Sequence, residues 1–386
     1  MAPIETMKAG SLPNTVPLAR NQLSEVAPVT ANSLRVRKHS LRPLRVGFVP
    51  LCDCAPIVVA HEWGFFARQG LEVVLSREVG WATVREKIIY GELDAAQATA
   101  AMVFAITLGL GSVRMPCVTG MVLNLHGNAI TLANRLWEAG VRDGATLREY
   151  VKANRGKSML TFGVVFRFST HDYLLRKFLR THGIEPERDV RIVVVPPPQM
   201  PGNLKAGNLD GFCVGEPWNS VAVIQRSGWV VDTSAAIAPL HPEKVLLVRH
   251  EFAQTRADEH LKLIAALRAA GEYCDQPQNR QGIADVLMKR RYVNANPLAL
   301  RRSLCGPFDV GKGKVESIPN FHIFSRYNAN EPTVERERIV VAQMRDSGAL
   351  PADAARDLPP QLCFRPDIFE RSNPQPKPQP AHLLTN

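Results

Sequence analysis

The sequence predicts an α/β protein with two lobes and mostly parallel sheets. Its 386 residues are too many for one ordinary core and enough for two packed lobes. Near the start, a short apolar strand at 44–49 is followed by a helix at 57–69 and a second strand at 71–75. A strand, a helix and a strand within about thirty residues form a βαβ unit, and such units build parallel sheets.

The same alternation continues along the chain. A helix at 83–90, stopped by Gly91, leads to a strand at 94–98. A second lobe is expected to begin either near Gly127 or after a polar helix at 147–152. Its expected strands are 159–165, 190–195 and 211–214.

A helix at 170–182 carries apolar side chains on one face, with Ser169 or Thr170 as its cap and Gly183 at its end. A strand at 244–248 then returns to the first lobe, and a helix from Asp258 onward packs outside it. Two lobes joined by crossing strands enclose a cleft, which is where ligands bind.

These boundaries divide the chain into four kinds of segment. Lobe I comprises residues 44–126 and 235–369, and lobe II comprises residues 127–234. Residues 1–43 lack any sustained period and are expected to form a disordered leader, and residues 370–386 a disordered, Pro-rich tail.

The net charge of +11 predicts a negatively charged partner, which could be a small anion, an acidic protein or nucleic acid. No basic stretch is interleaved with aromatic residues, so direct nucleic-acid binding is not expected. No apolar run is long enough to span a bilayer, and residues 1–43 contain no signal-peptide core. Seven scattered cysteines favour free thiols in a reducing compartment. We therefore expect a cytoplasmic protein without membrane contact.

Signatures of catalysis are missing. The sequence has no Gly-x-Gly-x-x-Gly after the first strand, no Walker loop, no Gly-x-Ser-x-Gly elbow and no His-Glu-x-x-His. The ten histidines show no metal-like spacing. We expect no enzyme activity, no cofactor and no metal.

Four residues stand in settings that suit an anion site. His171 lies in the first turn of a helix, where free N–H groups and the positive end of the dipole attract anions. Trp81 follows a strand of lobe I, and its indole offers a flat wall with one donor. Lys244 begins the returning strand, and Gly215 ends a strand where a backbone N–H is unobstructed.

Each of these residues has an alternative interpretation. His171 could bond a neighbouring loop, and Trp81 could be ordinary core. Lys244 could be a solvated surface lysine, as most lysines are. Gly215 could be a turn glycine before Pro217.

Several stretches together resemble the nitrate-binding and bicarbonate-binding receptors of bacterial ABC importers, and still more their cytoplasmic relatives, the NasS-type nitrate/nitrite sensors. The resemblance covers about residues 44–369. The stretches that carry it are Asp53 to Pro56, Trp63 to Phe66, Gly80-Trp81, Gly91 to Ala95, His171-Asp172, Val193 to Met200 (VVVPPPQM), Phe212 to Trp218 (FCVGEPW) and His241 to Lys244 (HPEK).

The resemblance implies a periplasmic-binding-protein-like, C-shaped clamp with the ligand held between the lobes. It implies ligand contacts from Trp81, His171, Gly215 and Lys244. A family glutamine would be replaced here by Asn128, with His126 as the other candidate for that position. Bicarbonate-selective members have an acidic residue where Lys244 stands, so a lysine there implies nitrate or nitrite as the ligand.

The resemblance to NasS-type sensors also implies a protein partner. Such sensors hold an RNA-binding antiterminator of the NasT type and release it when the anion binds. An alternative is the solute-binding subunit of a nitrate importer. A second alternative is an enzyme like the thiamine-pyrimidine synthases, which share the general fold; Cys52, Cys54 and His61 would then be its reactive or iron-binding groups.

Overall fold

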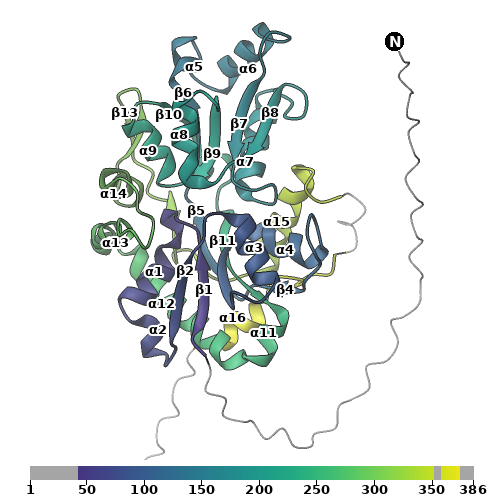
Figure 1. Cartoon of the computed structure of the whole chain (residues 1–386), viewed down its shortest axis with the longest axis vertical. Coiled ribbons are helices and arrows are strands. Elements are labelled where there is room, and N and C mark those ends of the chain that lie inside the picture. The colour runs from purple at the N-terminus through teal and green to yellow at the C-terminus, as the bar shows by residue number, and fades with distance from the viewer. Residues whose placement is uncertain (1–41, 352–357, 374–386) are drawn as a thin grey trace, which may run out of the picture. The chain divides into compact units, whose positions relative to one another are not determined.

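The computed structural model describes residues 42–351 and 358–373 of the chain (Figure 1). Most of the predicted leader and tail therefore lie outside the described residues. At the start of the described residues, the guanidinium of Arg42 forms an ion pair with Asp94. The last helix, α16 (Pro366–Arg371), extends beyond position 369, where lobe I was expected to end.

The first sheet has a parallel βαβ core. Strand β1 (Leu44–Phe48) pairs in parallel with β2 (Val73–Arg77) on one side and β3 (Ala95–Thr99) on the other. Strand β11 (Pro242–Arg249) then pairs antiparallel with β3, which confirms that the 244–248 strand returns to this lobe. The remaining strands of this sheet are β4 (Cys117–Val118), β5 (Val122–His126) and β14 (His322–Ile323).

The helix expected at 57–69 is divided in two. Helix α1 (Ala55–Glu62) ends before Gly64, and α2 (Phe65–Arg68) begins after it. Gly64 has φ +72°, a left-handed conformation that interrupts an α-helix and that glycine adopts without strain. The sequence pattern shows the apolar period on both sides of Gly64 but not this break.

The second sheet contains five strands in the order β10-β6-β9-β7-β8. Its parallel core confirms the three strands predicted for lobe II. Helix α7 (Thr170–Thr181) follows β7, and Ser169 caps it by accepting a hydrogen bond from the Asp172 N–H. The strands are β6 (Asn128–Ala133), β7 (Leu160–Val164), β8 (Val190–Val194), β9 (Gly211–Gly215) and β10 (Gly228–Thr233).

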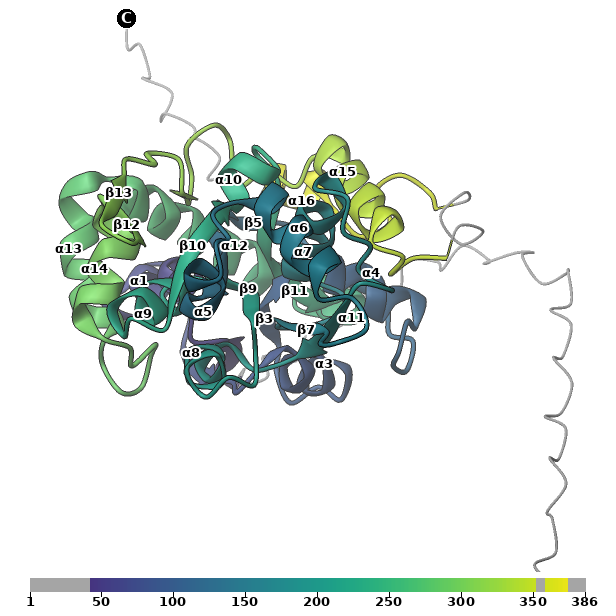
Figure 2. The same ribbon diagram turned by 90° about the horizontal axis from the view of Figure 1, so that it is seen from above.

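The other helices cover the two sheets and the connections between them (Figure 2). In the first part of the chain they are η1 (Cys52–Cys54), α3 (Trp81–Ile89), α4 (Ala100–Leu108), α5 (Asn134–Glu138), α6 (Gly144–Ala153), η2 (Pro197–Gln199), α8 (Met200–Lys205), α9 (Trp218–Ile224) and α10 (Ser234–Ile237). In the second part they are α11 (His250–Thr255), α12 (Ala257–Asp275), η3 (Pro277–Asn279), α13 (Arg280–Leu287), α14 (Pro297–Cys305) and α15 (Val334–Asp346). Strands β12 (Phe308–Gly311) and β13 (Lys314–Glu316) form a separate hairpin.

The chain crosses between the sheets at two adjacent places. Strand β5 of the first sheet passes to β6 of the second through His126 and Gly127, which both have positive φ. Strand β10 returns through α10 to β11. This first crossing lies close to the earlier of the two expected starts of the second lobe, near Gly127. The crossing strands explain why each sheet is mixed: β6 and β11 run antiparallel to the strands of the βαβ cores.

Two helices, α14 and α15, contact elements of both lobes. Helix α15 packs against α4 beside the first sheet and against α7 beside the second. Helix α14 packs against α9, and the hairpin strand β12 contacts α9 and β10. Among residues 42–351 and 358–373, no helix combines the length and the apolar character needed to cross a membrane.

Candidate functional site

Lys244 lies inside the molecule, where strand β11 faces the second sheet. Its side chain is fully buried, so it is not a solvated surface lysine. Its Nζ is 2.8 Å from Oδ2 of Asp53 and 2.5 Å from Oε1 of Glu243. Consecutive strand residues normally face opposite ways, but the β11–β5 pairing shifts register on both sides of Lys244. This irregularity lets Glu243 and Lys244 meet.

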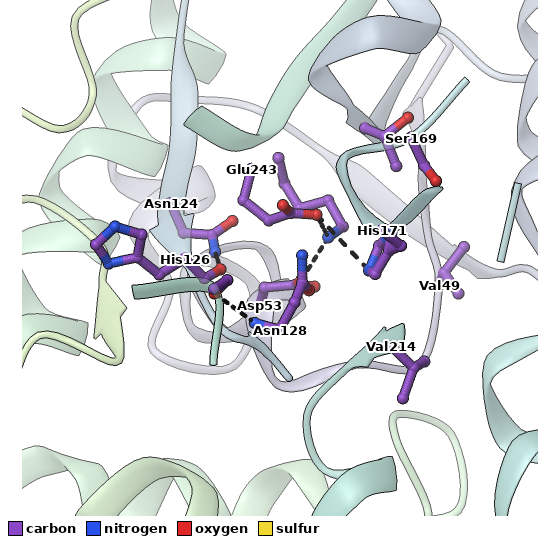
Figure 3. A network of polar contacts seen from close by, with 12 residues as sticks. Val49, Asp53, Asn124, His126, Asn128, Ser169, His171, Val214 and Glu243 are labelled. Carbon is purple, nitrogen blue, oxygen red and sulfur yellow. Dashed lines mark hydrogen bonds and ion pairs between the residues drawn. The ribbon is translucent and has the colours of Figure 1, made fainter. Parts of the chain in front are cut away.

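His171 lies near the start of α7 and points at the same cluster (Figure 3). Its Nε2 is 3.7 Å from Oε1 of Glu243, and its ring is fully buried. Neither ring nitrogen has a hydrogen-bond partner in the described protein. The other carboxylate oxygen of Glu243, Oε2, lies 3.1 Å from Nε2 of His241. Glu243 therefore stands between two imidazoles and an ammonium.

Trp81 is the first residue of α3 and forms a wall beside the lysine. The Lys244 Nζ is 5.4 Å from the centroid of the Trp81 ring, within the range of a cation–π interaction. The indole is 1% exposed, and its Nε1 has no hydrogen-bond partner among the described residues. A buried indole N–H usually has a partner, so this donor is available for a ligand.

Asn128 and Gly215 face each other across strands β6 and β9. A Cβ on Gly215 would lie 3.2 Å from Oδ1 of Asn128 and 3.5 Å from Oδ2 of Asp53, so any side chain there would enter the cluster. Both side-chain polar atoms of Asn128 are buried without a partner in the described chain. His126, the other candidate for the family glutamine, has both ring nitrogens engaged, with the Asn320 carbonyl and the Leu240 N–H.

The structure thus brings together all five predicted site residues, which come from α3, β6, α7, β9 and β11. Figure 3 shows Asp53, Asn128, His171 and Glu243 converging on one region. The site combines one ammonium with buried unpaired donors on an indole, an amide and an imidazole. Native proteins pair most of their buried polar atoms, so this concentration suits a small ligand with several acceptor atoms.

The charges in the site are nevertheless mixed. Burial disfavours the charged form of Lys244, but the carboxylates of Asp53 and Glu243 outweigh it and raise the lysine pKa. Burial also opposes ionisation of Glu243, yet Lys244 and the two imidazoles hold its pKa well below the usual range. Burial raises the pKa of Asp53 despite its ion pair with Lys244. Burial lowers the pKa of His171 to about 3, so this imidazole is neutral near pH 7.

Asp53 and Glu243 were not among the predicted site residues. Asp53 follows the first strand of lobe I, and loops at the carboxyl ends of parallel strands line clefts, so its position carried a usable signal. Glu243 carried none, because a regular strand would turn it away from the side that Lys244 faces.

The residues of the enzyme alternative do not form a reactive centre. The Cys52 and Cys54 thiols are buried, and burial raises the pKa of both, which keeps them protonated. His61 is exposed on α1. Within residues 42–351 and 358–373, no group of three or more His, Cys, Asp and Glu side chains is placed to hold a metal ion.

A separate cavity of about 460 Å³ lies elsewhere in the molecule. It is lined by Arg280, Arg302, Arg326 and apolar residues of the β12–β13 region, and by none of the five site residues. Because three arginines line it, this cavity is the place to compare with the five-residue site when the position of a bound anion is determined.

Two α/β lobes joined by adjacent crossing strands, with a polar site at their junction, define the class of solute-binding proteins. The structure of the periplasmic nitrate-binding protein NrtA from Synechocystis PCC 6803 superposes with a TM-score of 0.81 and 27% identity, over 86% of this chain and 88% of that one. The alkanesulfonate-binding protein SsuA from Xanthomonas axonopodis pv. citri shares the fold, with a TM-score of 0.60 and 14% identity over 83% of this chain and 96% of that one.

The chain belongs to the NMT1-like family, whose model matches residues 37–288. It is 41% identical over 331 residues to the nitrate import ATP-binding protein NrtC of Synechocystis, covering 84% of this chain and 49% of that protein. It is 38% identical over 281 residues to the bicarbonate transport ATP-binding protein CmpC of Synechocystis, covering 72% and 42%. It is 30% identical over 340 residues to the nitrate/nitrite binding protein NrtA of Synechocystis, covering 85% and 75%.

The chain thus spans about half the length of NrtC and CmpC, the relatives to which it is most similar among these. These findings confirm the predicted receptor family and the two-lobed α/β fold. The relatives and neighbours carry the names of binding proteins and transport components, in agreement with the prediction that this chain is not an enzyme.

Proposed function

We propose that this chain binds nitrate or nitrite between its two lobes, with Trp81, Asn128, His171, Gly215 and Lys244 as the ligand contacts. The observation that carries the proposal is a fully buried ammonium surrounded by buried donors that lack partners in the described chain. A planar oxyanion offers acceptor atoms in several directions and can lie against the Trp81 ring. The names of the NrtA relatives support the same ligand.

We prefer nitrate or nitrite to bicarbonate because the family resemblance implies an acidic residue in place of Lys244 in the bicarbonate-selective members. A fixed positive charge attracts any monoanion, and the carboxylates of Asp53 and Glu243 beside Lys244 could also accept the O–H of bicarbonate. Bicarbonate transport proteins are among the relatives, so this choice needs a direct test.

Isothermal titration calorimetry with nitrate, nitrite, bicarbonate and sulfate, in chloride buffer, tests the proposal. We expect saturable binding of nitrate or nitrite with one site per chain, and much weaker binding of bicarbonate and sulfate. No binding of either nitrogen oxyanion, together with no change in thermal stability, would exclude the proposed function.

The biological role that we propose for the site is a cytoplasmic sensor. In this role the anion-free protein holds a NasT-type RNA-binding antiterminator, and the anion releases it. The resemblance to NasS-type sensors supports this role, and so do the seven unpaired cysteines, which suit a reducing compartment. Release requires that the partner and the anion prefer different arrangements of the lobes.

The receptor subunit of a nitrate importer is the second candidate role, because the relatives are named for nitrate import and binding. Fractionation of cells separates the two roles by location. Copurification with an RNA-binding antiterminator in the absence of nitrate, and loss of that partner when nitrate is added, is expected of the sensor. Copurification with a membrane permease would instead favour the importer.

A further inference from the structure

The site that we propose for a monoanion already contains more buried carboxylates than ammonium groups. Asp53 and Glu243 both contact the single ammonium of Lys244, and all three side chains are at most 1% exposed. An added anion would bring a third negative charge into contact with one lysine. Uncompensated charge is very costly in a dry interior, so something must neutralise part of it.

We propose that Asp53 is a further ligand-contacting residue of the anion site, and that the anion binds together with one proton held by the Asp53 carboxyl group. The proton comes from solvent, and the anion takes the place of Asp53 as a partner of Lys244. The protonated carboxyl then donates a hydrogen bond to the anion. This inference rests on the proposed binding of a monoanion.

The surroundings of Asp53 assign different roles to its two oxygens. Gln97 Oε1 accepts a hydrogen bond from the Val49 N–H at 3.0 Å, which leaves the Gln97 Nε2 donor pointing at Oδ1 of Asp53. Oδ1 is therefore held as an acceptor. Oδ2 lies 2.8 Å from Lys244 Nζ, and it lies 3.5 Å from the position of a Cβ on Gly215. Oδ2 is thus the oxygen that faces the anion contacts and can carry the proton.

The other ionisable groups around Asp53 are less suited to hold the proton. From β11, Lys244 is already charged, and Glu243 is kept ionised by the lysine and two imidazoles. On the same short helix as Asp53, the thiols of Cys52 and Cys54 are already protonated because they are buried.

Three groups on other elements remain. Glu216, next to Gly215, accepts hydrogen bonds from the Ser303 hydroxyl and the Ser220 N–H, so it already belongs to a separate network.

His171 of α7 and His241 are the alternative holders. Neither ring nitrogen of His171 has a hydrogen-bond partner among the described residues, although burial lowers its pKa to about 3. The His241 ring contacts the Ala238 carbonyl and Glu243, and it makes no hydrogen bond with Asp53.

Uptake of one proton makes the affinity depend on pH with a defined sign. Where Asp53 is ionised in the anion-free protein and protonated in the complex, each rise of one pH unit weakens nitrate binding about tenfold. This range lies between the pKa of Asp53 in the anion-free protein, which burial raises, and its pKa in the complex. A neighbouring anion raises the second value further and so moves the upper limit of the range toward neutral pH.

Asp53→Asn tests the assignment, because the amide keeps the shape, keeps an acceptor for Gln97 and supplies a permanent donor where the protonated carboxyl would be. We expect nitrate affinity at about pH 8 to rise at least about tenfold, and to become nearly independent of pH from about pH 6 to about pH 9. Calorimetry in two buffers of different ionisation enthalpy should give about one proton taken up by the parent protein and about none by the variant.

Asp210→Asn is the matched control, since Asp210 is a buried acid that pairs with Arg135 in the second lobe, outside the site. It should leave affinity and proton uptake unchanged. If Asp53→Asn does not fold, infrared difference spectra of the parent protein with and without nitrate replace it, and we expect a new band of a protonated carboxyl group.

The outcomes are distinguishable. Absence of binding of both nitrate and nitrite to the parent protein at every pH refutes the proposed function itself. Binding that does not change with pH, without proton uptake, overturns the inference while the proposed function stands. Proton uptake that persists in Asp53→Asn, or a parent complex that takes up a proton without a protonated carboxyl band, assigns the proton to an imidazole, His171 or His241, and also overturns the inference.

Discussion

At the scale of single residues, Lys244 is the proposed anion contact that carries the charge, because no other ammonium among the described residues contacts Asp53 or Glu243. Lys244→Glu would place three buried carboxylates together. We expect nitrate affinity to fall at least about a hundredfold, the loss expected for removing a desolvated ion pair. Calorimetry measures the change.

Removing Lys244 also leaves Asp53 and Glu243 without their counter-ion, which destabilises the fold. The double variant Lys244→Met/Asp53→Asn removes one charge of each sign and serves as the control for folding. The unfolding temperature of the double variant should lie closer to that of the parent protein than the unfolding temperature of Lys244→Glu does. The double variant should still bind nitrate poorly. Nitrate binding of parental strength in this variant would remove Lys244 from the site.

The indole N–H of Trp81 can be tested on its own. Trp81→Phe keeps an aromatic ring beside Lys244, removes the unpaired Nε1 donor and makes the ring smaller. We expect nitrate affinity to fall between about tenfold and about a hundredfold, because a hydrogen bond to a charged acceptor contributes about 1.5–3 kcal/mol. Trp229→Phe is the matched control, since the Trp229 Nε1 is likewise buried and unpaired among the described residues but packs against Trp137 in the second lobe. Equal losses in both variants would exclude a specific role for Trp81.

The sequence was most informative where chemistry depends on one residue and its nearest neighbours. His171 could be placed at a helix start because the capping residue precedes it. Glu243 could not be placed, because its inward direction comes from irregular pairing of β11 with β5, and that irregularity depends on contacts between distant segments. The predicted set of site residues lacked Glu243 for this reason, whereas Asp53 follows a strand of lobe I, where a cleft residue could have been expected.

At the scale of elements, the β5–β6 crossing depends on close packing at Gly127. Gly127 has φ +95°, and a Cβ there would lie 2.5 Å from Cε1 of the buried His322. We expect Gly127→Ala to lower the free energy of unfolding by about 3 kcal/mol or more, through backbone strain and a clash in the core. Urea denaturation measures this.

Gly140→Ala provides the matched comparison. Gly140 has a similar φ of +93°, but no atom lies within 4 Å of its Cβ position. It should therefore show the cost of the backbone conformation alone, about 1 kcal/mol. Similar losses for both variants would show that His322 yields easily and that the crossing is not tightly packed.

Most elements could be predicted because their signals are local. The helix at 170–182 has a cap, an apolar face and a terminating Gly183, and the structure has α7 at Thr170–Thr181. The split of the helix at 57–69 could not be predicted, because a glycine inside an apolar period is compatible with a continuous helix. The left-handed conformation of Gly64 separates α1 from α2.

At the scale of the whole molecule, we expect ligand binding and stability to be linked, because the proposed anion contacts come from elements of both lobes. Nitrate at about one hundred times its dissociation constant should raise the free energy of unfolding by about 2.7 kcal/mol. Thermal denaturation with increasing nitrate measures this, and chloride at equal ionic strength is the control. Equal stabilisation by nitrate and chloride would indicate a general salt effect in place of binding.

The two-lobed organisation could be predicted from repeated βαβ units and the length of the chain. The bridging roles of α14 and α15 could not, because helix periodicity shows that a helix has a buried face without showing what covers it. These two helices contact elements of both halves, so opening of the site has to rearrange them.

We propose that one flat monoanion lies between the two sheets, in contact with Lys244, His171 and Trp81. A crystal structure of the protein grown with nitrate would show its position. We predict trigonal density within hydrogen-bond distance of Lys244 Nζ and the Trp81 Nε1. Nitrate found only in the cavity lined by Arg280 and Arg302, with water between Lys244 and His171, would exclude the proposed position of the anion.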